Sequence, residues 1–303
     1  MTEFHNVPGN GGGPLRVESG SASGGPQRQA ATQTDRRGQP VERGPLGAPS
    51  PRTFADNPHL VMIGRPDSPL AERYRRIRLR LEHGDSDVPF KPQVTVITSA
   101  IPGEGKTTTA TNLALAYAED RKSRTLLVGA DLRGPSVSRF LAAKPGIGLS
   151  SVLAGTARLE DALLEMSDSK LWVLPEGPSS ERPLEIVHTE HLAGLIAELR
   201  KRFDRIVIDT PPTVPFTDAA ILASHADATL LVVRARTTTK PLIRRAWESL
   251  SGSNVLGVVL NDVTFTVVDR YYNRYDDYEP GRYAYTGVAE ASTQVSRRDH
   301  SSN

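Results

Sequence analysis

The stretch that decides the fold is Ser99-Ala100-Ile101-Pro102-Gly103-Glu104-Gly105-Lys106-Thr107-Thr108, which follows the apolar run Val94 to Thr98. Gly103 and Gly105 allow a tight turn in which backbone N–H groups converge on phosphate oxygens. A helical pattern over residues 107–119 follows and places the positive end of its dipole at this turn. The stretch therefore predicts a nucleotide-binding loop between a strand and a helix.

Two side chains of this loop carry its chemistry. Lys106 is expected to reach the β- and γ-phosphates, and the Thr107 hydroxyl is expected to bind Mg²⁺. Ala100 stands where the motif usually has its first glycine, so the match depends on the variant that accepts either residue. The alternative, a glycine turn that only links strand to helix, is disfavoured by the flanking elements. The expected nucleotide-binding residues are Gly103, Glu104, Gly105, Lys106, Thr107 and Thr108.

A second strand-like segment, Arg205-Ile206-Val207-Ile208-Asp209-Thr210-Pro211-Pro212, ends in a carboxylate. Its three β-branched residues predict a strand buried within a parallel sheet, and the carboxyl ends of such strands are where these sheets bind ligands. Asp209 is therefore the candidate Walker B residue, which holds Mg²⁺ directly or through water. The alternative is an aspartate that only ends the strand before the turn at Pro211.

A third apolar segment, Thr125 to Gly129, leads into Ala130-Asp131-Leu132-Arg133. With the two motifs above, this series resembles the bacterial protein-tyrosine kinases of capsule and exopolysaccharide export, the BY-kinases of the deviant-Walker ATPase group. The resemblance covers residues 57–290. Its further matches are Ser68 to Arg75, Ala226-Asp227 before Leu230 to Arg234, Leu256 to Asn261, and a tyrosine cluster near the C-terminus.

The resemblance implies an α/β P-loop NTPase fold and transfer of phosphate from ATP, with Mg²⁺, to protein tyrosines. Asp131 would accept the proton of the attacking tyrosine, whose pKa is about 10 in water. Arg133 would steady phosphate or a loop, and Asn261 is the candidate for adenine recognition. The implied catalytic residues are Lys106, Asp131, Asp209 and Arg133, and the implied metal ligands are Thr107, Asp131 and Asp209.

One residue departs from the family pattern. The second motif, Walker A′, normally carries two aspartates separated by one residue, and Gly129 occupies the first position. The octahedral shell of Mg²⁺ can still be filled by Thr107, Asp209, phosphate oxygens and water. The missing carboxylate therefore weakens metal binding without abolishing it. Two interpretations stay open: an active autokinase, and an inactive nucleotide-binding scaffold. A partition-type ATPase is a third alternative, disfavoured because such proteins carry a lysine where this loop has Ile101.

The tyrosines are an independent signal, because six of the eight lie beyond the last predicted strand. No helical or strand period explains their spacing, and charged residues separate them. We expect a flexible tail that a neighbouring subunit phosphorylates, each phosphate adding about −1.5 to −2 charge at pH 7. The alternative is an aromatic surface for a partner or nucleic acid. The candidate phosphorylation sites are Tyr271, Tyr272, Tyr275, Tyr278, Tyr283 and Tyr285.

A helix is predicted over residues 68–83, with Ser68 and Pro69 at its start and four apolar residues on one face. Glu72, Arg75 and Arg78 share another stripe, which suits ion pairs across a subunit boundary. In the family a similar pattern builds a ring, so the resemblance implies a homo-oligomer. The alternative is a solvated face with pairs inside one helix.

Composition favours a cytoplasmic enzyme. The chain has no cysteine for a disulfide or thiolate site, and its formal charge of +2 is too small to favour nucleic acid. No apolar run is long enough to cross a membrane. By resemblance, the chain would be recruited to the inner face of the membrane by a polysaccharide co-polymerase that activates it, and a phosphotyrosine phosphatase would oppose it.

Domain boundaries follow composition and periodicity. Residues 1–56 are rich in Gly, Pro and Ser and are expected to be a disordered arm, residues 57–265 the kinase or ATPase domain, and residues 266–303 a flexible tail. Alternating elements predict a mainly parallel sheet with helices on both faces. Strands are expected near 94–100, 125–130, 171–175, 205–209, 229–234 and 255–260, helices near 106–120, 136–142, 158–166, 190–203, 217–225 and 240–251, and surface loops at 146–155 and 177–183. His188 and His191 are expected to be surface residues rather than metal ligands.

Overall fold

The computed structural model describes residues 3–6, 53–83, 91–141, 146–178 and 190–263. The chain divides into two units, Met1–Thr264 and Phe265–Asn303, and the second unit lies outside the described residues. The six candidate phosphorylation sites between Tyr271 and Tyr285 fall there. His188 also lies outside the described ranges, whereas His191 is exposed, as expected.

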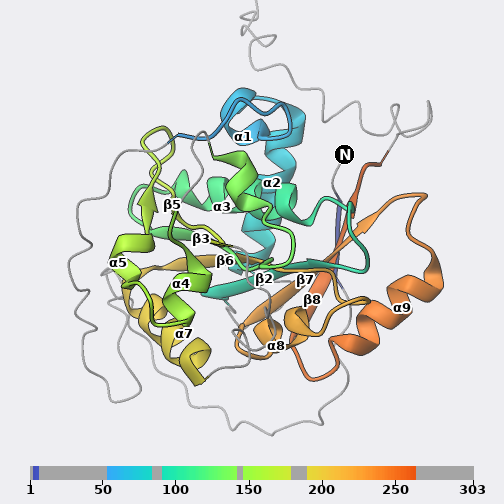
Figure 1. Cartoon of the computed structure of the whole chain (residues 1–303). Helices are drawn as coiled ribbons and strands as arrows, with labels where there is room; N and C mark the ends of the chain where they lie inside the picture. Colours follow the sequence, from blue (N-terminus) through green and yellow to red (C-terminus); the bar gives the residue numbers. More distant parts are fainter. Residues whose placement is uncertain (1–2, 7–52, 84–90, 142–145, 179–189, 264–303) are drawn as a thin grey trace, which may run out of the picture. The chain divides into compact units, whose positions relative to one another are not determined.

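One eight-stranded sheet forms the centre of the first unit, with the order β1-β8-β7-β2-β6-β3-β5-β4 (Figure 1). The six strands from β8 to β5 in this order pair in parallel, and β1 and β4 add antiparallel edges. This confirms the expected mainly parallel sheet. The strands are β1 (Glu3–Asn6), β2 (Val94–Ser99), β3 (Thr125–Gly129), β4 (Leu164–Glu165), β5 (Trp172–Leu174), β6 (Arg205–Asp209), β7 (Ala228–Arg234) and β8 (Val255–Asn261).

Helices cover both faces of the sheet, as predicted (Figure 1). The helices α1, α2 and α3 lie on one face, and α4, α7 and α8 lie on the other. The described helices are α1 (Val61–Gly64), α2 (Pro69–His83), α3 (Lys106–Ala118), α4 (Leu149–Leu153), α5 (Leu159–Ala162), α7 (Glu190–Arg202), α8 (Asp218–Ser224) and α9 (Lys240–Ser249), with a 3-10 helix η1 (Val137–Phe140). Among these described elements, none is long and apolar enough to cross a membrane.

Successive side chains of the central strands point to opposite faces of the sheet, which divides the hydrophobic core into two clusters. Val94 and Val96 pack into the cluster that includes residues of α4, α5, α7 and α8, whereas Ile97 and Leu127 join the cluster under α2 and α3. Both faces of these strands are buried, which explains why they appear in the sequence as continuous apolar runs. The carboxyl ends of the strands are thereby held in place for the loops that follow them.

The helix predicted over residues 68–83 is α2. The Ser68 hydroxyl accepts a hydrogen bond of 3.2 Å from the amide of Ala71, which satisfies one of the unpaired donors at the start of the helix. Tyr74, Ile77 and Leu81 follow at helical spacing and are buried in the same cluster as α3.

One expectation near the edges of the sheet was wrong, and one strand lies in a segment where no strand was expected. The region 158–166 is not one helix, because α5 ends at Ala162 and β4 then pairs with β5. This pairing satisfies backbone groups of β5 that a helix would leave at an open edge. At the other edge, Glu3–Asn6 lie in the segment expected to be disordered, yet they form β1 against β8.

Three smaller differences concern local elements. The expected loop 146–155 contains α4, and the expected helix 136–142 is limited to the 3-10 helix η1. Before the predicted boundary at 57, Phe54 is buried and its backbone pairs with Leu141.

Candidate active site

The phosphate-binding loop joins β2 to α3 and has the predicted backbone. Gly103 and Gly105 have φ angles of 83° and 92°, in the left-handed region that favours glycine. The side-chain amide of Asn261 donates a 3.0 Å hydrogen bond to the Glu104 carbonyl oxygen, and a Cβ atom on Gly105 would lie 2.0 Å from its Nδ2. The left-handed φ and this close approach favour glycine at position 105. Asn261, at the end of β8, lies against the loop, and its contact with adenine stays a prediction.

The Glu104 side chain is absent from the lining of the two cavities beside the loop, and nucleotide binding by this residue stays a prediction. Its carboxylate is buried beneath the loop, where Oε2 accepts a 2.8 Å hydrogen bond from the amide of Ile101 and Oε1 accepts one from the Thr238 hydroxyl. A carboxylate turned toward bound phosphates would repel them, whereas here it ties the loop to the segment before α9. The Glu104 side chain therefore braces the loop from the side away from the site.

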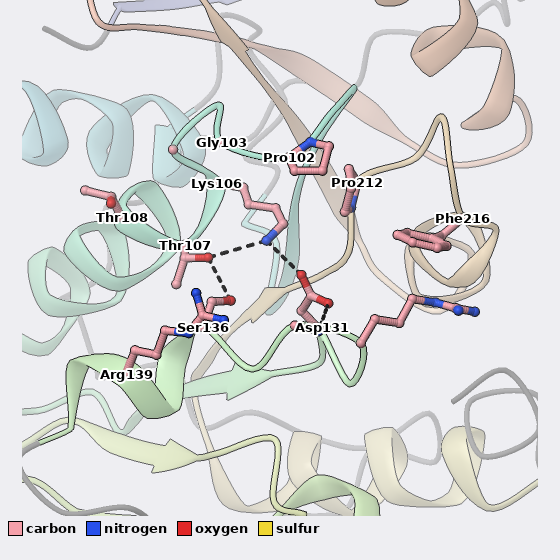
Figure 2. Close-up of a pocket in the computed structure, with 13 residues that line it drawn as sticks. Pro102, Gly103, Lys106, Thr107, Thr108, Asp131, Ser136, Arg139, Pro212 and Phe216 are labelled. Carbon is pink, nitrogen blue, oxygen red and sulfur yellow. Dashed lines mark hydrogen bonds and ion pairs between the residues drawn. The ribbon is translucent and has the colours of Figure 1, made fainter. Parts of the chain in front are cut away.

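Lys106, the first residue of α3, forms an ion pair with Asp131 from the loop after β3. Lys106 Nζ lies 2.9 Å from Asp131 Oδ2, and the other oxygen of Asp131 accepts a 3.0 Å hydrogen bond from the Gly134 amide. Figure 2 shows Lys106 between Asp131 and the Thr107 hydroxyl. Burial lowers the pKa of Lys106, but the negative charges of Asp209 and Asp131 outweigh burial and raise that pKa above its ordinary value.

Asp209, at the end of β6, is fully buried and accepts hydrogen bonds on one oxygen. The hydroxyls of Thr107 and Ser136 lie 2.8 and 3.0 Å from Oδ2, and 3.0 Å from each other. Oδ1 has no hydrogen-bond partner among the residues that the structure describes. Burial raises the pKa of Asp209 to about 6, although the Lys106 charge and the two hydroxyls oppose this shift.

These residues fit a magnesium ion. The ion prefers oxygen ligands, usually one or two carboxylates together with phosphate oxygens and water. The unpartnered Oδ1 of Asp209 is a buried acceptor that a cation would satisfy, and the Thr107 hydroxyl lies beside it. Asp131 adds a second carboxylate on the other side of Lys106. The three expected metal ligands are thus gathered in one place.

Arg133 braces the wall of the site. Its guanidinium lies 3.2 Å from the carboxylate of buried Asp218, at the start of α8, and 4.2 Å from the centre of the Phe216 ring. These contacts join the segment after β3 to the start of α8 and the loop before it. Contact of Arg133 with phosphate stays a prediction.

Two neighbouring cavities share the loop. The first, about 560 Å³, contains Lys106, Thr107, Asp131 and Arg133 in its lining. The second, about 380 Å³, contains Asn261 and lies on the other side of the loop. Gly103, Gly105 and Thr108 line both cavities, and binding of a nucleotide along them stays a prediction.

Sequence reasoning missed several residues of the first cavity. Ser136 directly precedes η1, Arg139 lies within it, and Phe216 comes from the loop before α8; Figure 2 shows all three beside the predicted residues. Glu176, from the loop after β5, is buried behind them. None belongs to a motif in the sequence, although Ser136 follows the Walker A′ segment closely enough to be suspected from its position.

The predicted oligomerisation stripe lies on α2, and its three residues are absent from the linings of these cavities. Within the single chain, Arg75 pairs with Glu119 at 2.6 Å and with Glu72 at 3.4 Å. Arg78 donates to the Ala116 carbonyl at 2.6 Å and lies 3.6 Å from Glu119. The arginines therefore tie α2 to the end of α3, and a role between subunits stays a prediction.

Comparison with known proteins agrees with this geometry. The sequence model of a family described as "AAA domain" matches residues 93–240. Tyrosine-protein kinase YwqD of Bacillus subtilis is 36% identical over 205 residues, which cover 67% of this chain and 85% of YwqD. The succinoglycan biosynthesis transport protein ExoP of Rhizobium meliloti is 32% identical over 230 residues, covering 74% of this chain and 29% of ExoP.

A solved structure, the chimerical protein CapA2B2, is also similar. It shares 32% identity with this chain at a TM-score of 0.64, covering 73% of this chain and 96% of that one. The Lys106, Thr107, Asp131 and Asp209 cluster thus occurs on the scaffold of enzymes that are named as tyrosine kinases. The chain belongs to the bacterial tyrosine-protein kinase family of capsule and exopolysaccharide biosynthesis, which includes YwqD and CpsD.

Proposed function

We propose that this protein is an ATP-dependent tyrosine autokinase that phosphorylates its own C-terminal cluster, Tyr271 to Tyr285, in a neighbouring subunit. The observation that carries the proposal is the 2.9 Å pair between Lys106 and Asp131 beside Asp209, with one oxygen of Asp209 left unpartnered among the described residues. A phosphate-binding cation, a proton acceptor and a metal ligand would thereby act from one cluster.

The roles follow from these positions. Lys106 and the loop amides would bind the phosphates of ATP, and Thr107, Asp209 and Asp131 would hold Mg²⁺. When bound, Mg²⁺ would neutralise charge that develops on the phosphates. The tyrosine oxygen forms a bond to the γ-phosphorus as the bond to ADP breaks, and the phenolic proton passes to Asp131. Asn261 lines the second cavity and would contact adenine there.

The relatives suggest where the enzyme works. ExoP, a transport protein of polysaccharide biosynthesis, matches this chain over 29% of its length, and the CapA2B2 chimera matches over nearly all of its own. We infer that this chain acts in the cytoplasm beside a membrane-bound co-polymerase that recruits and activates it. Phosphorylation and its reversal by a phosphatase then regulate polymerisation and export of a polysaccharide.

Mass spectrometry of phosphotyrosine tests the proposal. The full-length protein is incubated with ATP and Mg²⁺, with and without the cytoplasmic tail of a candidate co-polymerase. The wild type should gain phosphate between Tyr271 and Tyr285, and Lys106→Met should gain none. Lys201→Met is the matched control, because Lys201 is exposed on α7, away from both cavities, and it should behave as wild type. Phosphotyrosine on the Lys106→Met variant would contradict the proposed mechanism.

Position 129 carries a glycine where the family pattern has an aspartate. This departure favours a second candidate function, an inactive scaffold that binds nucleotide. Such a protein would bind ATP through Lys106 and Thr107 but leave its tyrosines unmodified even with the activating tail present. ATP binding without phosphotyrosine in the experiment above would select this alternative.

A further inference from the structure

Gly129 and Glu176 share one space in the structure. A Cβ atom on Gly129 would lie 2.7 Å from Cδ of Glu176 and 2.9 and 3.0 Å from its two oxygens, closer than side chains tolerate. Glu176 follows β5, the strand that pairs with β3, at whose end Gly129 stands. The carboxylate of Glu176 therefore occupies the volume of a side chain at position 129, where the family pattern has an aspartate.

Glu176 is buried, and its carboxylate is fully engaged. Oε1 accepts hydrogen bonds of 2.7 Å from the amides of both Ser136 and Val137, and Oε2 accepts 3.0 Å from the amide of Ser138 and a further bond from its hydroxyl. A carboxylate offers about four acceptor positions. All four are used, so Glu176 acts on the site through the segment that it holds and through its charge.

Residues 136–138, which Glu176 holds, reach the expected metal ligands Thr107 and Asp209. Ser136, whose amide donates to Glu176, places its hydroxyl 3.0 Å from both Asp209 Oδ2 and the Thr107 hydroxyl. The charge of Glu176 also acts on Asp209, since it adds to burial in raising the pKa of that carboxyl group. A continuous series of contacts thus links Glu176 to the residues expected to bind Mg²⁺.

The backbone of Glu176 is fixed as well. Its carbonyl oxygen accepts a 3.0 Å hydrogen bond from the Ser150 amide, and the carbonyl of Pro175 accepts one of 2.7 Å from Leu149. Both donors belong to the first turn of α4, so the loop after β5 is anchored on either side of the carboxylate. A group held in this way can position its partners without rearranging itself.

We propose that Glu176 is a positioning residue that replaces, from the neighbouring strand, the Walker A′ carboxylate that position 129 lacks. It orders residues 136–138, sets the Ser136 hydroxyl against Asp209, and restores negative charge behind the metal site. Gly129 and Glu176 are then a matched pair, in which the small residue makes room for the long one. The inference rests on the proposed function only in assuming that Mg²⁺ and ATP bind at this cluster.

A double-mutant cycle tests the pairing. The variants are Glu176→Ala, Gly129→Asp and the two combined, with Glu176→Gln as a variant that keeps the side-chain volume. Glu248→Gln on α9 is the matched control, because its side chain is exposed and far from the cluster in sequence. Three readouts are taken on the full chain: ATP affinity with Mg²⁺ and with EDTA, the melting temperature without nucleotide, and hydrogen exchange of the amides of residues 136–138.

Loss of the carboxylate should weaken ATP affinity about 10- to 100-fold when Mg²⁺ is present and leave the affinity in EDTA nearly unchanged. The amides of residues 136–138 should exchange faster in Glu176→Gln. Gly129→Asp alone should lower the melting temperature because its side chain meets the Glu176 carboxylate. The combined variant should recover both the melting temperature and the Mg²⁺-dependent affinity toward wild type, and Glu248→Gln should change neither.

Two outcomes would overturn the inference. Wild-type Mg²⁺-dependent affinity in both Glu176 variants would show that the carboxylate does not serve the site. Additive losses in the combined variant would show that the two positions are independent. None of the readouts requires phosphotyrosine, so a protein that never phosphorylates itself but shows the coupling would refute the autokinase and keep the pairing.

Discussion

The hydroxyl of Thr107, in the first turn of α3, donates to Oδ2 of Asp209 at the end of β6 across 2.8 Å, joining two motifs that are 102 residues apart. Ser136 adds a second hydroxyl to the same oxygen at 3.0 Å. Because both hydroxyls contact Oδ2, this oxygen is held in place while Oδ1 has no partner in the described part of the chain. Asp209 is thus oriented to present one oxygen to a cation.

Asp209→Asn should separate metal binding from folding. The substitution keeps the side-chain volume but removes the charge, so the Mg²⁺-dependent part of ATP affinity should fall at least about 10- to 100-fold. The free energy of unfolding without metal should stay within about 1 kcal/mol of wild type, because burying an unpaired carboxylate is itself costly. Calorimetric titration with ATP, with and without Mg²⁺, and urea unfolding measure the two effects.

Asp161→Asn is the control for this prediction. Asp161 lies on α5 with its side chain 54% exposed, and the substitution removes the same charge from the surface. It should change neither quantity. A wild-type Mg²⁺ dependence in Asp209→Asn would remove Asp209 from the metal site, and a large loss of stability would assign it a structural role instead.

Most of the fold could be predicted because the central strands are apolar runs with motif residues at their ends. The strands from β2 to β8 that pair in parallel were located within a few residues. The edges could not be predicted in the same way. The four residues of β1 carry no periodic signal, and their pairing depends on the open edge of β8, which exists only after the sheet has formed.

The residues of the site also divide into those that the sequence could predict and those that it could not. Lys106, Thr107, Asp131 and Asp209 follow strands directly and belong to motifs, so their convergence at one edge of a parallel sheet could be expected. Ser136 and Glu176 could not, because they meet only through the order β6-β3-β5 and the close approach to Gly129. The missing Walker A′ aspartate was visible in the sequence, but the carboxylate in its place was visible only in three dimensions.

The double variant Arg75→Ala/Arg78→Ala tests the expected ring. Ion pairs near the surface contribute about 0–1 kcal/mol each, so losing the contacts with Glu119 and the hydrogen bond to Ala116 should lower the melting temperature moderately without unfolding the chain. If the same arginines also bridge subunits, the mass measured by light scattering should fall from an oligomer to a monomer. We expect this result, together with reduced phosphorylation in trans.

Arg76→Ala/Arg80→Ala removes the same charge from exposed positions of α2 and serves as the control. Its mass should match that of the wild type. An unchanged mass in Arg75→Ala/Arg78→Ala would restrict those arginines to tying α2 to α3, which is the contact that the single chain already contains.

Asp227 provides a prediction for the dependence of stability on pH. Its carboxylate accepts hydrogen bonds of 2.9 and 2.8 Å from the amides of Gln93 and Val94, and pairs with Arg200 at 2.8 Å. Burial raises the pKa of Asp227, but Arg200 and the two amides outweigh burial and hold that pKa below its ordinary value. The carboxylate therefore joins the start of β2 to the end of α7.

The pKa of Asp227 is lower in the folded than in the unfolded chain. Its contribution to the free energy of unfolding is therefore complete above the pKa of the unfolded chain, about 3.9, and disappears as the pH falls through the pKa of the folded chain. Asp227→Asn should therefore lower the free energy of unfolding by about 2 kcal/mol at pH 7, where charged hydrogen bonds are lost. The difference from wild type should shrink below pH of about 4, as urea unfolding across this range will measure. A loss that stays constant with pH would mean that the shape of the side chain, rather than its charge, holds the two elements together.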